Sequence, residues 1–203
     1  MLVSANRLIG TRILSMQSAG PIGAISAPIV EPETFKILAF YLSGPLVANR
    51  ENNILDVQSI REYSSFGCVV DSIDELIAKD DVIKISKAID LKFNPIGLKV
   101  ETKKGNKLGR VIDFTVTSED YMIQQIIVKR PLVKSFTDPE LTIPRKEIVE
   151  VTDFKIIVKD EEKVIKEKAK KEEFIPNFVN PFRNSEQDLA PAHTKTPADK
   201  DIE

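Results

Sequence analysis

Pro95-Ile96-Gly97-Leu98-Lys99-Val100 and Leu108-Gly109-Arg110-Val111-Ile112-Asp113-Phe114 flank the polar turn Lys103-Lys104-Gly105-Asn106-Lys107. Gly105 adopts a positive φ at little cost, so this turn between two apolar segments favours a hairpin. From Leu108 to Thr117 the residues alternate, and a period of two predicts a half-buried strand. The predicted faces are Ile112, Phe114 and Val116 on one side, and Val111, Asp113 and Thr115 on the other.

More short strands are predicted further along the chain. Apolar runs at 121–129, 141–144, 148–152 and 155–159 are strand candidates, separated by polar turns and a proline-containing loop at 130–140. Many short strands at close spacing, with little helix, are typical of a small barrel that is closed or nearly closed.

An internal repeat extends this pattern to the first half of the chain. Leu8-Ile9-Gly10-Thr11-Arg12-Ile13 resembles residues 95–100, and Pro21-Ile22-Gly23-Ala24-Ile25 resembles residues 107–111, at offsets of 87 and 86 residues. An ordered series of matches with such small slips predicts a tandem duplication. The further matched pairs are Ile37 with Ile123, Phe40 with Ile126, Leu42 with Val128, Pro45 with Pro131, Leu55 with Leu141, Val57 with Ile143, and Val69-Val70 with Ile156-Ile157.

The repeat gives a domain plan. We expect a first barrel at 4–79, a linking helix at 80–91 and a second barrel at 92–160. In the linker, apolar residues recur at helical spacing after Asp80 and Asp81, either of which can cap a helix. Pro28 cannot donate a ladder hydrogen bond, so it predicts an edge or a bulge in the first barrel. Residues 161–203 are rich in Lys and Glu and then in Pro, Asn and Asp, which predicts a charged helix followed by a disordered tail.

The second repeat resembles the PRC-barrel family. That family includes the cytoplasmic barrel of the photosynthetic reaction-centre H subunit and the C-terminal domain of a ribosome maturation factor. The resemblance covers about residues 4–160 and implies an all-β fold of two tandem small PRC-type barrels. It also implies a docking module without a catalytic motif. Ala27 departs from the pattern, because the family often has Asp there. The residues that carry the resemblance are Ile96, Gly97, Val100, Gly105, Leu108, Gly109, Val111, Asp113, Ile126, Val128, Leu141, Ile143 and Pro144.

The sequence offers few groups for catalysis. His193 is the only histidine and Cys68 the only cysteine, so histidine-based triads and zinc sites made of Cys or His ligands are excluded. The carboxylates Asp113 and Asp56 are expected to face solvent or form salt bridges, with a two-carboxylate active site as the alternative. We therefore expect no enzymatic activity, no cofactor and no metal site.

Charge and cysteine use bear on partners and location. The chain has 29 basic and 31 acidic residues, without the basic excess typical of non-specific nucleic-acid binding. Candidate partner contacts are Lys103, Lys104, Lys107 and Arg110, with a merely solvated turn as the alternative. We expect another protein as partner, with a ribosomal particle or RNA as the alternative, and no small-molecule ligand. A lone cysteine, expected to be buried, fits the cytoplasm, and no apolar run reaches the roughly 20 residues of a membrane span.

Overall fold

The computed structural model describes residues 1–131 and 139–160 of the chain. Contacts group Met1–Glu162 into one compact unit. The charged helix and tail expected at 161–203 lie outside the described residues, as does the segment 132–138.

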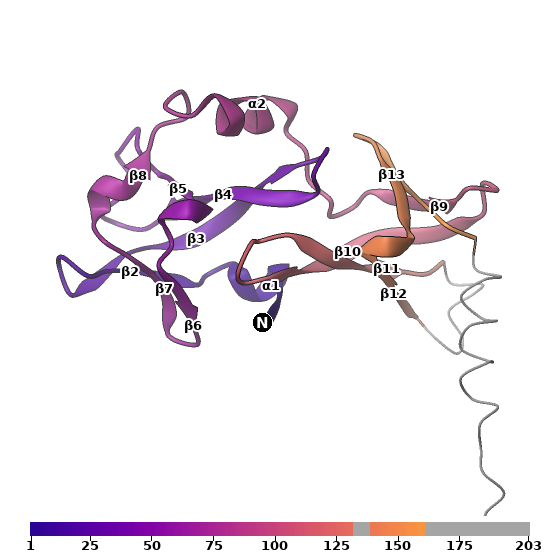
Figure 1. Cartoon of the computed structure of the whole chain (residues 1–203), viewed down its shortest axis with the longest axis horizontal. Coiled ribbons are helices and arrows are strands. Elements are labelled where there is room, and N and C mark those ends of the chain that lie inside the picture. The colour runs from indigo at the N-terminus through magenta and orange to yellow at the C-terminus, as the bar shows by residue number, and fades with distance from the viewer. Residues whose placement is uncertain (132–138, 161–203) are drawn as a thin grey trace, which may run out of the picture. The chain divides into compact units, whose positions relative to one another are not determined.

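The described chain is mostly β, as predicted, and its strands form two sheets of seven strands (Figure 1). In spatial order, the first sheet contains β6 (Glu62–Ser64), β7 (Gly67–Val70), β2 (Arg12–Ser15), β3 (Gly20–Glu31), β4 (Lys36–Ser43), β5 (Ile54–Asp56) and β8 (Leu76–Ile77). The second contains β12 (Glu140–Pro144), β11 (Ile123–Lys129), β10 (Lys107–Thr117), β9 (Lys99–Thr102), β14 (Lys155–Val158) and β13 (Ile148–Val151), with β1 (Leu2–Ser4) also paired to β10. The helices are α1 (Ala5–Leu8) and α2 (Ile83–Leu91), with short 3-10 turns η1 (Val57–Ser59), η2 (Ile73–Glu75) and η4 (Arg145–Glu147).

Neither sheet closes into a barrel within the described residues, because the strands at the two ends of each path are not paired with each other. The expectation of two tandem barrels, each closed or nearly closed, is therefore met only at the coarser level of two small sheets. Each sheet has a parallel pair next to antiparallel ones: β2 with β7 in the first, and β9 with β14 in the second.

The two sheets repeat the same backbone plan. Their strand orders correspond from β6 to β5 and from β13 to β12. The β3–β4 and β10–β11 registers coincide at an offset of 86 residues, including two bulges in each pair. Gly10 and Gly97 have φ of 82° and 89°, and their amides donate to the carbonyls of Ile25 and Val111, both at 2.8 Å. The repeat seen in the sequence is thus folded as the same arrangement twice.

Three of the matches drawn from the sequence are wrong by one or two residues. Leu55 pairs with Phe40 as Ile143 pairs with Ile126, so Leu55 corresponds to Ile143 and not to Leu141. The same offset of 88 places Val57 against Arg145, and Val69-Val70 against Ile157-Val158. The cause is two extra residues in the second half between β11 and β12, which shift every later match.

The faces predicted for β10 also need correction. Val111 is 1% exposed and lies in the core with Phe114 and Val116, whereas Ile112 is only half-buried. A bulge between Val111 and Asp113 interrupts the alternation, because an extra residue turns the side chains that follow it to the opposite face. The equivalent bulge of β3, between Ile25 and Ala27, lies next to Pro28, as the missing amide predicts.

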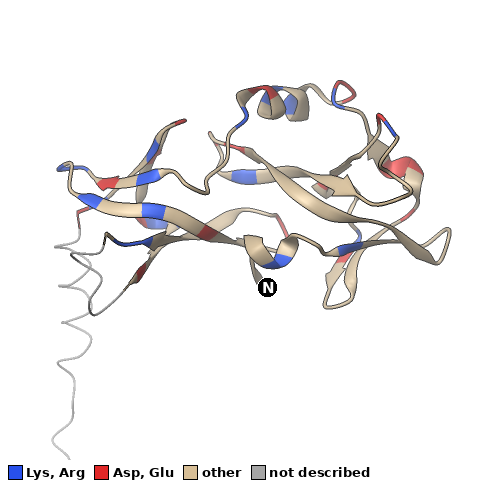
Figure 2. Ribbon diagram, turned by 180° about the vertical axis from the view of Figure 1, so that it is seen from behind, with Lys and Arg blue, Asp and Glu red and all other residues tan. Residues whose placement is uncertain are grey.

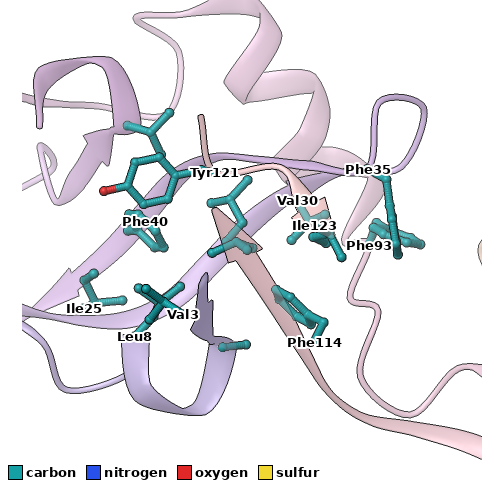
Figure 3. Close-up of a cluster of buried hydrophobic side chains, with 14 of the residues drawn as sticks. Val3, Leu8, Ile25, Val30, Phe35, Phe40, Phe93, Phe114, Tyr121 and Ile123 are labelled. Atoms are coloured by element: carbon teal, nitrogen blue, oxygen red, sulfur yellow. The ribbon is translucent and has the colours of Figure 1, made fainter. Parts of the chain in front are cut away.

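The two halves share one hydrophobic core, which Figure 3 shows in close-up. Phe35 and Tyr121 occupy equivalent turns, and both are buried with a positive φ, of 54° and 55°. Around them the Ile37 amide donates to the Tyr121 carbonyl (3.0 Å), and the Ile123 amide donates to the Phe35 carbonyl (3.1 Å). We call this reciprocal pair of bonds the seam. Equivalent residues of the two halves contact each other reciprocally in the seam, as equivalent residues do at the isologous interface of a symmetric dimer.

The outer faces of the two sheets differ. In the first, Ile29, Leu38 and other apolar side chains are buried under Ile85 and Ala88 of α2 (Figure 1). The positions equivalent to Ile29, Leu38, Ala39 and Ile54 in the second half are Thr115, Gln124, Gln125 and Thr142. The apolar residues of α2 recur at helical spacing because one face of the helix packs on the first sheet.

The capping expected for α2 is not observed. Its N-cap is Val82, which makes no side-chain cap. Asp80 accepts a hydrogen bond from the Ser86 hydroxyl, and Asp81 accepts one from the Ala78 amide, so both carboxylates bind groups other than the first helical amides.

A strand from the N-terminus joins the second sheet, which the repeat did not predict. β1 pairs with β10 in the register Val3 to Val116. The Asp113 carboxylate accepts hydrogen bonds from the Ser4 hydroxyl (2.6 Å) and from the Asn6 amide (3.3 Å), at the start of α1. Ala27 is the equivalent of Asp113 in β3, and in the described residues no strand equivalent to β1 pairs with β3.

Candidate functional site: a basic groove on the second sheet

A groove of about 890 Å³ lies on the second sheet, over β9, β10 and the end of β11. We call it the basic groove. The described residues of its lining are cations, aliphatic residues, glycines, two prolines and one acid: Ile96, Gly97, Lys99, Val100, Glu101, Lys107, Gly109, Arg110, Val111, Ile112, Lys129, Arg130, Pro131 and Pro139.

The fold places these side chains through simple strand alternation. Val100 and Val128 are buried, so their strand neighbours Lys99 and Lys129 lie on the opposite, exposed face. The bulge in β10 adds Ile112 to the same lining. Gly109 has φ of 147°, and a Cβ built there would lie 1.9 Å from the Lys129 carbonyl oxygen. Only glycine therefore lets β10 approach β11 this closely.

Cross-strand pairing arranges cations in a row. Arg110 of β10 lies directly opposite Lys129 of β11 on one side and Lys99 of β9 on the other. Lys99 in turn lies opposite Lys155 of β14. Four neighbouring strands therefore each contribute one cation, and we call these four residues the cation row. Like charges directly opposite one another on a sheet are destabilising, so the row costs stability unless an anion compensates it.

Little negative charge offsets this row. Within the described ranges 1–131 and 139–160, Glu101 is the only acid that lines the basic groove, and its carboxylate is paired with Lys155 at 3.4 Å. Figure 2 shows Lys and Arg gathered on the strands of the second sheet. The basic groove is therefore cationic, although the whole chain carries a formal net charge of −2.

The four candidate contacts from the sequence divide into two pairs. Lys107 and Arg110 line the basic groove, and the Arg110 guanidinium donates to the Gly97 carbonyl at 3.0 Å. Lys103 and Lys104 are exposed in the turn between β9 and β10 and are not among the lining residues. Sequence reasoning missed Lys99, Lys129 and Arg130 as lining residues; alternation with buried valines was the signal that could have found the first two.

The first sheet lacks the same charge. The positions equivalent to Lys129, Arg110, Lys99 and Lys155 are Ser43, Ala24, Arg12 and Gly67, with a single cation among them. Because the backbone pairing is the same in both halves, the cation row is a property of side chains in the second half and not of the fold.

A second groove, of about 780 Å³, lies beside the N-terminus and the β6–β7 turn. Its lining includes Phe66 and Met1, which are 82% and 69% exposed, together with Arg7 and Arg12.

The residues considered for chemistry have structural roles. Asp113 holds the start of α1, and Asp56 accepts a hydrogen bond from the Gln58 amide at the start of η1. Cys68 is fully buried, as predicted, and burial raises the pKa of its thiol to about 11. In the described ranges, no three His, Cys, Asp or Glu side chains are grouped as a metal site would require.

Comparisons with models of known protein families and with curated proteins found no match to this chain. None of the helices in residues 1–131 and 139–160 is long and apolar enough to span a bilayer.

Proposed function

We propose that the protein is a cytoplasmic, non-enzymatic docking module of PRC-barrel type, and that its basic groove receives a segment of another protein. The observation that carries the proposal is the cation row, which spans four strands of one sheet; among the described lining residues, Glu101 is the one acid that compensates it. Retaining a destabilising arrangement of like charges is typical of a binding surface.

Two features support the PRC-type assignment. The two halves repeat one strand order, which agrees with the tandem copies that the resemblance implies. Gly97 and Gly109, two residues of the family pattern, both have a positive φ, which glycine adopts more readily than any other residue.

The test uses the full-length chain immobilised against cell extract, compared with the variant Lys99→Glu/Lys129→Glu. A docking role predicts a defined set of proteins that the wild type retains after nuclease treatment. The control is an unrelated immobilised protein of the same net charge. If the wild type retains no protein beyond those that this control retains, the docking role is wrong.

A role in RNA binding or ribosome assembly is the second candidate, because the described lining of the basic groove includes the cations Lys99, Lys107, Arg110 and Lys129, which suit contacts to phosphates. Co-sedimentation with ribosomal particles over a range of salt concentrations separates the two proposals. Association at low salt that nuclease abolishes supports the RNA role. Absence of co-sedimentation at every salt concentration dismisses it.

A further inference from the structure

We infer that the basic groove binds an acidic peptide segment that also carries aliphatic side chains. The inference rests on the docking role proposed above and names the chemistry of the partner.

The charge of the basic groove favours an acidic ligand. Lys99, Arg110 and Lys129 lie opposite one another on adjacent strands, and neighbouring strands are about 4.8 Å apart. Lys107 adds another exposed cation to the lining. Carboxylates placed along this row relieve the repulsion between the cations and form charge-assisted hydrogen bonds, so the row favours a ligand with several acidic groups.

The apolar part of the lining favours aliphatic side chains in the ligand. Ile96 is 40% exposed and Ile112 is half-buried, and two prolines complete this part of the basic groove. Aliphatic surface of this kind gains free energy by burying aliphatic side chains of a partner. A ligand that matches both features alternates acidic with aliphatic residues.

The same lining argues against single-stranded RNA. Proteins that bind single strands usually stack bases on aromatic rings. Among the lining residues that the structure describes there is no Phe, Tyr, Trp or His, so phosphate contacts to these residues would act without stacking.

Fluorescence anisotropy with the full-length chain tests the inference. The probe is a labelled peptide in which Glu alternates with Leu and Ile, compared with a peptide carrying Gln in place of Glu. We expect the acidic peptide to bind, with an affinity that falls as salt rises. The Gln peptide is expected to bind much more weakly, because it keeps the apolar contacts and loses the ionic ones.

Charge reversal locates the binding surface. Lys99→Glu/Lys129→Glu is expected to weaken peptide binding by roughly tenfold or more. The matched control, Arg50→Glu/Lys87→Glu, makes the same change in net charge at two exposed positions outside the groove lining, in the first half and in α2, and is expected to bind like the wild type. Should the first variant fail to fold, Lys99→Gln/Lys129→Gln removes the charge without reversing it.

Three outcomes overturn the inference: no binding of the acidic peptide to the wild type, equal loss in both charge-reversal variants, or tighter binding of oligouridine than of the peptide. The docking role is judged separately. If the wild type and Lys99→Glu/Lys129→Glu retain the same proteins from extract, docking stands and the basic groove is not its site.

Discussion

At the scale of single residues, the two halves preserve geometry more closely than residue identity. In the first half the Thr34 hydroxyl donates to the Glu31 carboxylate across the turn before β4. In the second, the Thr117 hydroxyl donates to Asp120 across the turn before β11. Positions 31 and 117 are equivalent, as are 34 and 120, so donor and acceptor have exchanged places while the bond remains.

The Asp120 bond makes stability depend on pH. Hydrogen bonds from the Thr117 hydroxyl and the Met122 amide lower the pKa of Asp120 below its ordinary value of 3.8. A lowered pKa stabilises the fold above the ordinary value, and this contribution is lost as pH falls through the folded-state pKa. We expect Asp120→Asn to reduce the loss of stability on acidification below about pH 4. Urea denaturation over that pH range measures it, and identical pH profiles for the two proteins would contradict the assignment.

The strictest residue requirement is at Gly109. Gly109→Ala brings a Cβ to 1.9 Å from the Lys129 carbonyl oxygen, so β10 and β11 must separate. We expect a loss of more than about 2 kcal/mol in the free energy of unfolding. Gly105→Ala is the control: it shares a positive φ but meets no atom within 4 Å. Strain alone predicts a loss of about 1 kcal/mol there. Equal losses in the two variants, measured by urea denaturation, would refute the close approach.

At the scale of elements, the contact between Asp113 and the N-terminus fixes β1 and α1 on the second sheet. Removing one partner of a part-buried hydrogen bond to a charged group costs about 1–3 kcal/mol. We expect Ser4→Ala and Asp113→Ala each to destabilise the protein and the double variant to lose less than the sum. A double-mutant cycle in urea provides the measurement. Strictly additive losses would show that the two side chains act independently.

Strand positions in the second half were largely predictable from sequence. The predicted strand at 108–117 matches β10 (Lys107–Thr117), and that at 148–152 matches β13 (Ile148–Val151). Alternation fails where a bulge intervenes, since the extra residue at Ile112 leaves no signal in the apolar pattern. β1 was missed because a strand of three residues is too short to show an alternation of apolar and polar side chains. Its pairing partner is also more than 100 positions away in the sequence.

The site was only partly predictable for a related reason. Lys107 and Arg110 were identified because they adjoin one basic turn. Lys99 and Lys129 lie far from each other in sequence and meet Arg110 only through strand register. Register depends on long-range pairing, which a single sequence does not specify at the level of individual residues.

At the scale of the whole molecule, the seam makes the duplicated halves one folding unit. Buried residues of both halves belong to a single core, and Phe40 of the first contacts Tyr121 of the second edge-on, with ring centroids 5.5 Å apart. The Arg145 guanidinium also donates to the carbonyls of Thr34 (2.7 Å) and Phe35 (3.3 Å). Neither half can expose this surface without losing much of its own core.

This shared core predicts a single unfolding transition. Cys68 lies in the first half, fully buried and with a raised thiol pKa, so it should react with a thiol reagent near neutral pH only after unfolding. We expect the urea midpoint of Cys68 labelling to coincide with that of β-sheet loss followed by circular dichroism. Labelling that begins at clearly lower urea would show that the first half opens alone.

The proposed docking role assigns binding to the second half, because only this half carries the cation row on the shared backbone plan. An NMR titration of the full-length chain with the acidic–aliphatic peptide compares the two halves residue by residue. We predict amide shift changes at Lys99, Arg110, Ile112 and Lys129, and none at the equivalent Arg12, Ala24, Ser26 and Ser43. Equal changes in both halves, or changes confined to the first, would show that the cation row is not the binding surface.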